Sequence, residues 1–143
     1  MQGVGDPMVP AARPGATPTK GADVTDRIEE LMARNVTEVF DERAEGRRRQ
    51  AIESIYAEGA GVHAVEGSSR GWDAVDAVVR TVQAEAVGLS FSIVVPPTVV
   101  ADLGRLGWAL GPADGPPVVT GTDVAIVRDG RIAELYTFID LPA

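Results

Sequence analysis

The stretch from Val118 to Leu141 reads VVTGTDVAIV, then RDG, then RIAELYTFIDL. Two runs of strand-forming residues flank an Asp-Gly pair, and this combination is the strongest short-range signal for a β-hairpin. A single carboxylate, Asp123, lies inside the first run among apolar neighbours. Because an unpaired charge is costly to bury, Asp123 must be exposed, paired or functional.

The turn of this hairpin can be read in two registers. A two-residue loop at Asp129-Gly130 places Asp123 opposite Tyr136, whereas a three-residue loop that begins at Arg128 places it opposite Leu135. Since side chains alternate with period two, this difference exchanges the faces of one strand relative to the other. We prefer the three-residue loop because it separates a bulky face, suited to packing or dimerisation, from a face of smaller residues around the acid.

The preferred register predicts the composition of both faces of the hairpin. The bulky face carries Val124, Ile126, Ile132, Tyr136 and Phe138. The other face carries Asp123, Ala125, Val127, Ala133, Leu135, Thr137 and Ile139. Both faces are largely apolar, so we expect both to be covered.

The composition restricts the class of protein. The chain has 143 residues, enough for one domain with a real core, and no cysteine, which excludes disulfides and thiolate chemistry. Its net charge of -8 argues against nucleic acid and anionic membranes as partners. With one histidine and no cysteine, no metal site is predicted. No apolar run approaches the ~20 residues that span a bilayer, and the N-terminus does not resemble a signal peptide, so we expect a soluble cytoplasmic protein.

The N-terminal part divides into a tail and the start of a domain. Residues 1–22 are rich in proline and glycine and are predicted to be a disordered tail, which leaves residues 23–143 as the domain. A helix is expected from Asp23 or Thr25 to about Arg43. Its apolar residues have the spacing of one helical stripe: Ile28, Leu31, Met32, Val36, Val39 and Phe40.

The rest of the chain is predicted to form two more helices and then mainly strands. A second helix is predicted at 47–57, with Arg47, Arg48 and Arg49 in a solvated first turn, and a third at 71–86. Strand-like runs are found at 59–65, 89–95, 98–103 and 105–110, before the final hairpin. Helices grouped ahead of an antiparallel sheet indicate an α+β fold with the helices on one face.

SnoaL-like members of the nuclear transport factor 2-like superfamily are similar to this chain in that order of elements. They are also similar in four segments: LMARN (31–35), IYAEGAGVHAVEG (55–67), RGWDAV (70–75) and GTDVAIVRDGRIAELYTFID (121–140). The resemblance, over about residues 24–141, implies a cone-shaped, curved antiparallel sheet wrapped around three helices, with cystatin-like topology and an apolar pocket. It also implies a homodimer through the outer face of the sheet, which matches Val124, Ile126, Ile132, Tyr136 and Phe138.

The resemblance implies candidate site residues. In ketosteroid isomerases of this fold, a protonated Asp donates a hydrogen bond to the substrate oxyanion, and Asp123 occupies that position. Asn35 and Tyr56 occupy the positions of two supporting tyrosines. The position of the general base is Ala64, so Glu66, two residues further on, is predicted to substitute for it.

Other residues complete the predicted site. His63, the only histidine, is a further catalytic candidate, although it faces the opposite side unless the strand is bulged. Trp108, Leu135 and Thr137 are predicted to contact the substrate. Compared with epoxide hydrolases of this fold, Asp123 matches one of two carboxylates, while Thr137 replaces the second. Glu134 is expected at the rim of the sheet, solvated or paired with Arg131 or Arg128.

Three functions are compatible with these residues. The first is a cofactor-free isomerase, cyclase or hydratase that binds a hydrophobic polyketide-, steroid- or terpenoid-like substrate, with Asp123 as acid, base or hydrogen-bond donor. The second is a non-catalytic ligand-binding or dimerisation module, and the third is a subunit that docks another protein through its sheet. An apolar cavity that holds Asp123 and a second titratable group would favour the enzyme.

Overall fold

The structure, a computed structural model, describes residues 20–140. Most of the predicted tail, residues 1–19, lies outside the described residues. Helix α1 (Lys20–Arg34) begins three residues earlier than the predicted start at Asp23 and runs into a π-helical segment, Asn35–Phe40. The apolar stripe predicted for this helix is confirmed, because five of its members are at most 2% exposed: Ile28, Leu31, Met32, Val36 and Val39.

Two further helices complete the helical part. Helix α2 (Glu45–Ile55) begins two residues before the start predicted at 47, and residues 41–44 separate it from the π-helical segment. Helix α3 (Trp72–Glu85) lies within the range 71–86 predicted for the third helix, but it follows two strands rather than the one predicted. Among residues 20–140, no helix is both long enough and apolar enough to cross a membrane.

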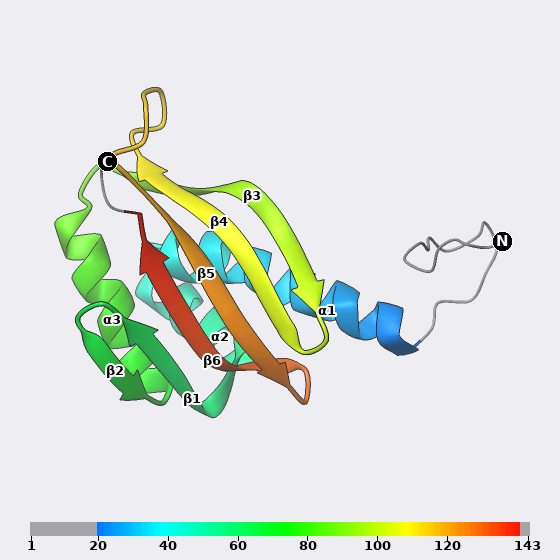
Figure 1. Cartoon of the computed structure of the whole chain (residues 1–143). Coiled ribbons are helices and arrows are strands. Elements are labelled where there is room, and N and C mark those ends of the chain that lie inside the picture. Colours follow the sequence, from blue (N-terminus) through cyan, green and yellow to red (C-terminus); the bar gives the residue numbers. More distant parts are fainter. Residues whose placement is uncertain (1–19, 141–143) are drawn as a thin grey trace, which may run out of the picture.

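The strands form one six-stranded sheet in the order β2-β1-β6-β5-β4-β3. Their bounds are β1 (Tyr56–Ala64), β2 (Gly67–Arg70), β3 (Ser90–Val100), β4 (Leu103–Gly111), β5 (Val119–Arg128) and β6 (Arg131–Ile139). Figure 1 shows the sheet curving over the helices, which all lie on its concave side. The α+β fold is thus confirmed, with one correction: β1 and β6 are parallel, so the sheet is mixed rather than wholly antiparallel.

Two segments differ from the predicted strands. The segment EGSSRG, predicted as a loop, contains β2, which pairs with β1 around the two-residue turn Val65-Glu66. The runs at 89–95 and 98–103 are not separate strands, because β3 continues through Pro96-Pro97. Strand β3 lies at the edge of the sheet and has only one neighbour, so its prolines break no hydrogen bond to a second strand. The register with β4 shifts at Pro96-Pro97.

The register of the final hairpin corrects both registers predicted from the sequence. Asp129 and Gly130 form a two-residue turn with φ angles of 53° and 76°, typical of a type I′ turn. The preferred three-residue loop is therefore wrong. However, Ala133 has no partner on β5 and forms a bulge, so Asp123 lies opposite Thr137.

The bulge also decides which side chains share a face. Because Ala133 is one extra residue in β6, the side chains after it point to the faces that the three-residue loop predicted. Asp123, Leu135 and Thr137 therefore share the inner face, as predicted. Before the bulge the alternation is reversed. Ile132 therefore lies opposite Val127 and is completely buried, and its predicted place on the outer face is wrong.

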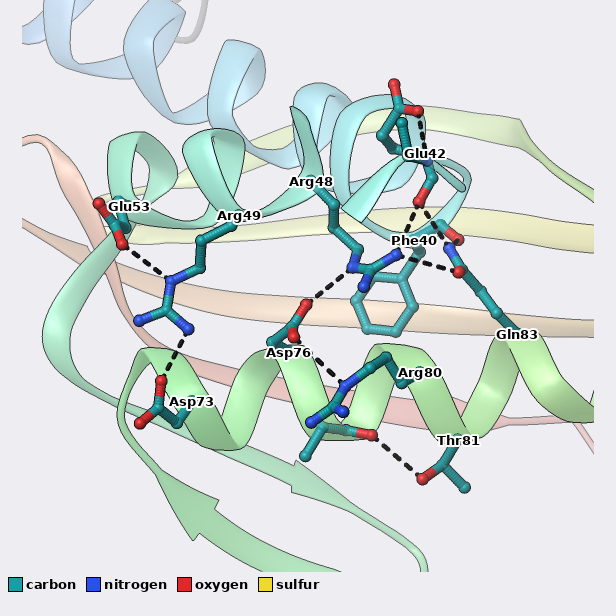
Figure 2. A network of polar contacts seen from close by, with 12 residues as sticks. Phe40, Glu42, Arg48, Arg49, Glu53, Asp73, Asp76, Arg80, Thr81 and Gln83 are labelled. Carbon is teal, nitrogen blue, oxygen red and sulfur yellow. Dashed lines mark hydrogen bonds and ion pairs between the residues drawn. The ribbon is translucent and has the colours of Figure 1, made fainter. Parts of the chain in front are cut away.

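A network of buried polar groups joins α2 to α3 (Figure 2). Arg48 is only 3% exposed, which corrects its predicted place in a solvated turn. Its Nε donates to Asp76 Oδ1 at 2.7 Å, and its Nη1 donates to Gln83 Oε1 at 3.2 Å and to the Glu42 carbonyl at 3.3 Å. Arg80 Nε contacts the other Asp76 oxygen at 3.3 Å. The network holds α3 against α2 and the connection before it.

Candidate active site

A cavity of about 270 Å³ lies between the concave face of the sheet and the helices. Its lining comes mainly from β4, β5 and β6 on one side and from α3 and the π-helical segment on the other. The lining is mostly apolar and includes Val36, Phe40, Val62, Val78, Val82, Phe91, Trp108, Leu110, Val119, Leu135 and Ile139. A space of this size and character suits a small apolar molecule.

Asp123 supplies the buried carboxyl group of this cavity. It lies on β5 between Leu106 of β4 and Thr137 of β6, and it is 5% exposed. Trp108 Nε1 donates to its Oδ1 at 3.0 Å, and the Thr137 hydroxyl donates to the same oxygen. Among the described residues, no side chain or backbone group donates to Oδ2. One carboxyl oxygen is therefore fixed by the protein, and the other is available to a ligand.

The surroundings of Asp123 shift its proton affinity. Burial disfavours the charged form and raises the pKa of this carboxyl from 3.8 to about 6, although the hydrogen bonds from Thr137 and Trp108 act in the opposite direction. In the described part of the chain, no arginine, lysine or histidine lines the cavity. Near pH 6 both protonation states are populated, so the group can either donate or accept a proton.

The predicted second acid, Glu66, lies at the mouth of the cavity. It is in the turn between β1 and β2, lines the cavity and is exposed. Glu85, at the end of α3, also lines the cavity and is exposed, and no motif or spacing had singled it out. Ala64 lines the cavity too, so the position of the missing general base does face the ligand space.

Asn35 and Tyr56 are brought together, but not in the lining of the cavity. The Tyr56 hydroxyl donates to Asn35 Oδ1 at 2.7 Å, and both residues are at most 1% exposed. Burial, and secondarily the charge of Asp123, raise the pKa of Tyr56 well above its ordinary value. The predicted role of both residues in substrate contact is corrected to that of a neutral hydrogen-bonded pair in the core.

His63 is not part of the cavity. Its ring lies on the convex face of the sheet, stacked on Tyr136 with ring centroids 4.5 Å apart. The strand is regular between Val62 and Ala64, so alternation points His63 away from Asp123. Its predicted catalytic partnership with Asp123 is therefore wrong.

The role of Trp108 as a hydrogen-bond donor to Asp123 was missed by sequence reasoning, which placed this residue only in the pocket wall. Trp108 pairs with Gly121, and a Cβ atom on that glycine would lie 2.2 Å from Trp108 Cζ2. The glycine thus lets the indole lie over β5 and reach the carboxyl two residues away. The signal available in the sequence was Gly121, two residues before Asp123 in the same strand, because a glycine in a strand often marks the close approach of another group.

Several solved structures have a fold similar to that of this chain. No protein-family model and no curated protein matches the chain significantly. A candidate isomerase of the SnoaL-like family from Agrobacterium tumefaciens is 22% identical, with a TM-score of 0.71 over 83% of this chain and 99% of that chain. A candidate SnoaL-like polyketide cyclase from Jannaschia sp. is 16% identical, with a TM-score of 0.69 over 88% and 92%.

A candidate ketosteroid isomerase from Kribbella flavida is 15% identical, with a TM-score of 0.62 over 83% of this chain and 82% of that chain. At these identities the comparisons establish the fold. The chain has the fold of SnoaL-like and nuclear transport factor 2-like proteins, which confirms the fold that the resemblance in its sequence implied.

Proposed function

We propose that this protein is a cofactor-free acid/base enzyme of the isomerase or cyclase kind, which acts on a small apolar substrate that carries a carbonyl or hydroxyl oxygen. The observation that carries the proposal is the state of Asp123. Its Oδ1 accepts hydrogen bonds from Trp108 and Thr137, the residue lines an apolar cavity, and the pKa of its carboxyl is about 6. A general acid or base is most effective when its pKa lies near the working pH.

One carboxyl group is sufficient for the chemistry proposed. The ionised form of Asp123 removes a proton from a carbon next to a carbonyl group, and the protonated form then returns it to another atom of the same molecule. The apolar lining keeps water from competing for the proton. Indole and hydroxyl donors hold the carboxyl in one orientation throughout, so that little reorganisation accompanies the transfer.

Epoxide hydrolysis or hydration has less support within this general class. The arginine and second acid of such sites correspond to Gly121 and Thr137, neither of which can supply the missing charge. Steroid-type proton transfer with a separate base requires Glu66 to reach inward from the mouth of the cavity. The proposal therefore assigns both acid and base roles to Asp123.

The proposal can be tested without the natural substrate. In deuterated buffer, the protein should catalyse exchange of the α-protons of a bicyclic ketone such as 2-tetralone, followed by NMR. Asp123→Asn should slow this exchange about 100-fold, because it removes the acid/base group but keeps the shape of the side chain. Glu58→Gln, which removes an exposed carboxylate outside the cavity, is the control. Equal exchange by both variants would contradict the assignment.

The second candidate function is a non-catalytic ligand-binding module. The observation in its favour is that, among the residues 20–140 that line the cavity, Asp123 is the only buried titratable one, because Glu66 and Glu85 are exposed. On this reading the Asp123→Asn variant changes the affinity for apolar ketones or alcohols, and neither variant nor parent protein catalyses proton exchange.

Homodimerisation through the convex face of the sheet, and a cytoplasmic location, stay predictions. Phe138 and Tyr136 are 57% and 37% exposed on that face, next to the half-buried Val124 and Ile126, which supports an apolar contact there. Phe138→Arg should convert a dimer to a monomer in light scattering. A monomeric parent protein would exclude this interface.

A further inference from the structure

A second group of reactive side chains lies on the convex face of the sheet, remote from the cavity. His63 Nδ1 is 2.7 Å from Ser68 Oγ, and His63 Nε2 is 2.7 Å from Glu134 Oε1. The three residues come from β1, β2 and β6, which are neighbours in the sheet. A hydroxyl, an imidazole and a carboxylate in hydrogen-bonded series are the parts of an activated nucleophile.

The proton positions in this series follow from Glu134. Its hydrogen bonds with His63 and then Arg70 hold the pKa of this carboxyl below its ordinary value, so it is ionised and can only accept. His63 Nε2 must therefore carry a proton. In the neutral imidazole, Nδ1 is then the acceptor, and the Ser68 hydroxyl donates to it. This is the tautomer in which a histidine can take a proton from serine.

The neighbours of His63 fix its ring from several sides. Tyr136 stacks against it, with an angle of 18° between the rings. Arg70 holds Glu134 through Nη1 and Nη2 at 3.0 and 3.3 Å. A Cβ atom at Gly61 would lie 2.3 Å from Glu134 Oε1 and 2.8 Å from His63 Nε2, so the group fits only over a glycine.

We propose that Ser68 is an activated nucleophile that accepts acyl groups from activated esters or thioesters. Ser68 Oγ bonds to the acyl carbon while its proton passes to His63 Nδ1. The bond from the acyl carbon to the leaving oxygen or sulfur breaks, and the leaving group takes that proton from His63. Water then repeats the sequence on the acylated serine, releases the carboxylic acid and restores the hydroxyl.

The surroundings of Ser68 indicate how an acyl donor would approach it. Ser68 is exposed on β2, the edge strand, so the acyl donor approaches from solvent without entering a pocket. An edge strand also presents backbone N–H groups that have no partner in the sheet, and such donors can stabilise a tetrahedral oxyanion. The exposed rings of Tyr136 and Phe138 belong to the face proposed for homodimerisation, so the donor is expected to contact the β2 edge rather than these rings.

The test uses p-nitrophenyl acetate and p-nitrophenyl butyrate as acyl donors and locates the acyl group by peptide mass spectrometry. Ser68→Ala should abolish the adduct and lower the hydrolysis rate about 10- to 100-fold, and His63→Gln should do the same. Ser69→Ala is the matched control, because alternation points this adjacent serine to the opposite face of the strand. It should leave both the adduct and the rate unchanged.

Glu134 acts through His63 and is a positioning residue, so its test needs a readout that simple destabilisation would not move. Glu134→Gln should slow acylation of Ser68, while Glu134→Asp, which keeps a carboxylate, should retain more of the rate at equal thermal stability. Hydrolysis that survives Ser68→Ala unchanged, or an adduct on any other residue, would overturn the proposal.

Discussion

Replacement of Asp123 by Asn should change how the stability of the protein depends on pH. Asn is uncharged and similar in shape, and its side-chain oxygen can still accept from Trp108 and Thr137. In the parent protein, the folded state raises the pKa of Asp123 from 3.8 to about 6. The folded protein therefore binds this proton more tightly than the unfolded chain does.

The sign of the effect follows from that difference. The stabilising contribution of the neutral carboxyl is fully present below pH 3.8 and is lost as the pH rises through about 6. The full loss is about 3 kcal/mol, since each pKa unit is worth about 1.4 kcal/mol. Roughly 2 kcal/mol of it falls between pH 4.5 and 7.5. Because Asp123 is only 5% exposed, solvent screening reduces this figure little.

The assay is urea unfolding of parent protein and Asp123→Asn at several pH values in this range. All other titrating groups are common to both proteins and cancel in the difference. The variant should gain about 2 kcal/mol relative to the parent from pH 4.5 to pH 7.5. A difference that stays flat within about half a kcal/mol would show that the carboxyl titrates normally. The acid/base role proposed for it would then lose its basis.

Three other perturbations test the structure. Arg48→Met should destabilise the protein by about 3–5 kcal/mol in denaturant unfolding, because it leaves Asp76 buried and charged, and adding Asp76→Leu should recover part of the loss. Gly121→Ala should abolish folding or lower the stability by several kcal/mol in circular-dichroism melts, since its Cβ would lie 2.2 Å from the Trp108 ring. The control is Gly59→Ala, whose Cβ would have no atom within 4 Å and which should fold normally. Trp108→Phe removes a hydrogen bond to the ionised carboxyl in the cavity and should move the pKa of that carboxyl upward, measured by NMR titration.

Local signals in the sequence predicted much of the fold. The stripe from Ile28 to Val39 identified α1 and its buried face, because helical spacing is a property of neighbouring residues. Asp129-Gly130 identified the hairpin for the same reason, since a type I′ turn needs two residues that tolerate positive φ. The prediction of Asp123 in an apolar setting came from its neighbours along one strand.

Contacts between secondary-structure elements were harder to predict from the sequence. The bulge at Ala133 cannot be read from the hairpin alone, because it depends on how the curved sheet packs over the helices. This single residue decided that Thr137 rather than Tyr136 lies opposite Asp123, whereas the two-residue turn placed Ile132 opposite Val127, where it is buried. Likewise, the charge of Arg48 suggested solvent, and only α3, 28 residues away, supplied the carboxylate that allows its burial.

Spacing and composition within short segments predicted the secondary-structure elements and the α+β class, whereas the placement of Asp123 in a pocket came from the resemblance to SnoaL-like proteins. The tertiary structure decided which groups meet. It gave Asp123 its donors from Trp108 and Thr137 and its raised pKa, and it placed His63 on the opposite face beside Ser68 and Glu134. The physical reason is that hydrogen bonds and desolvation depend on distances across strands, and those distances are fixed only when the sheet has its register and curvature.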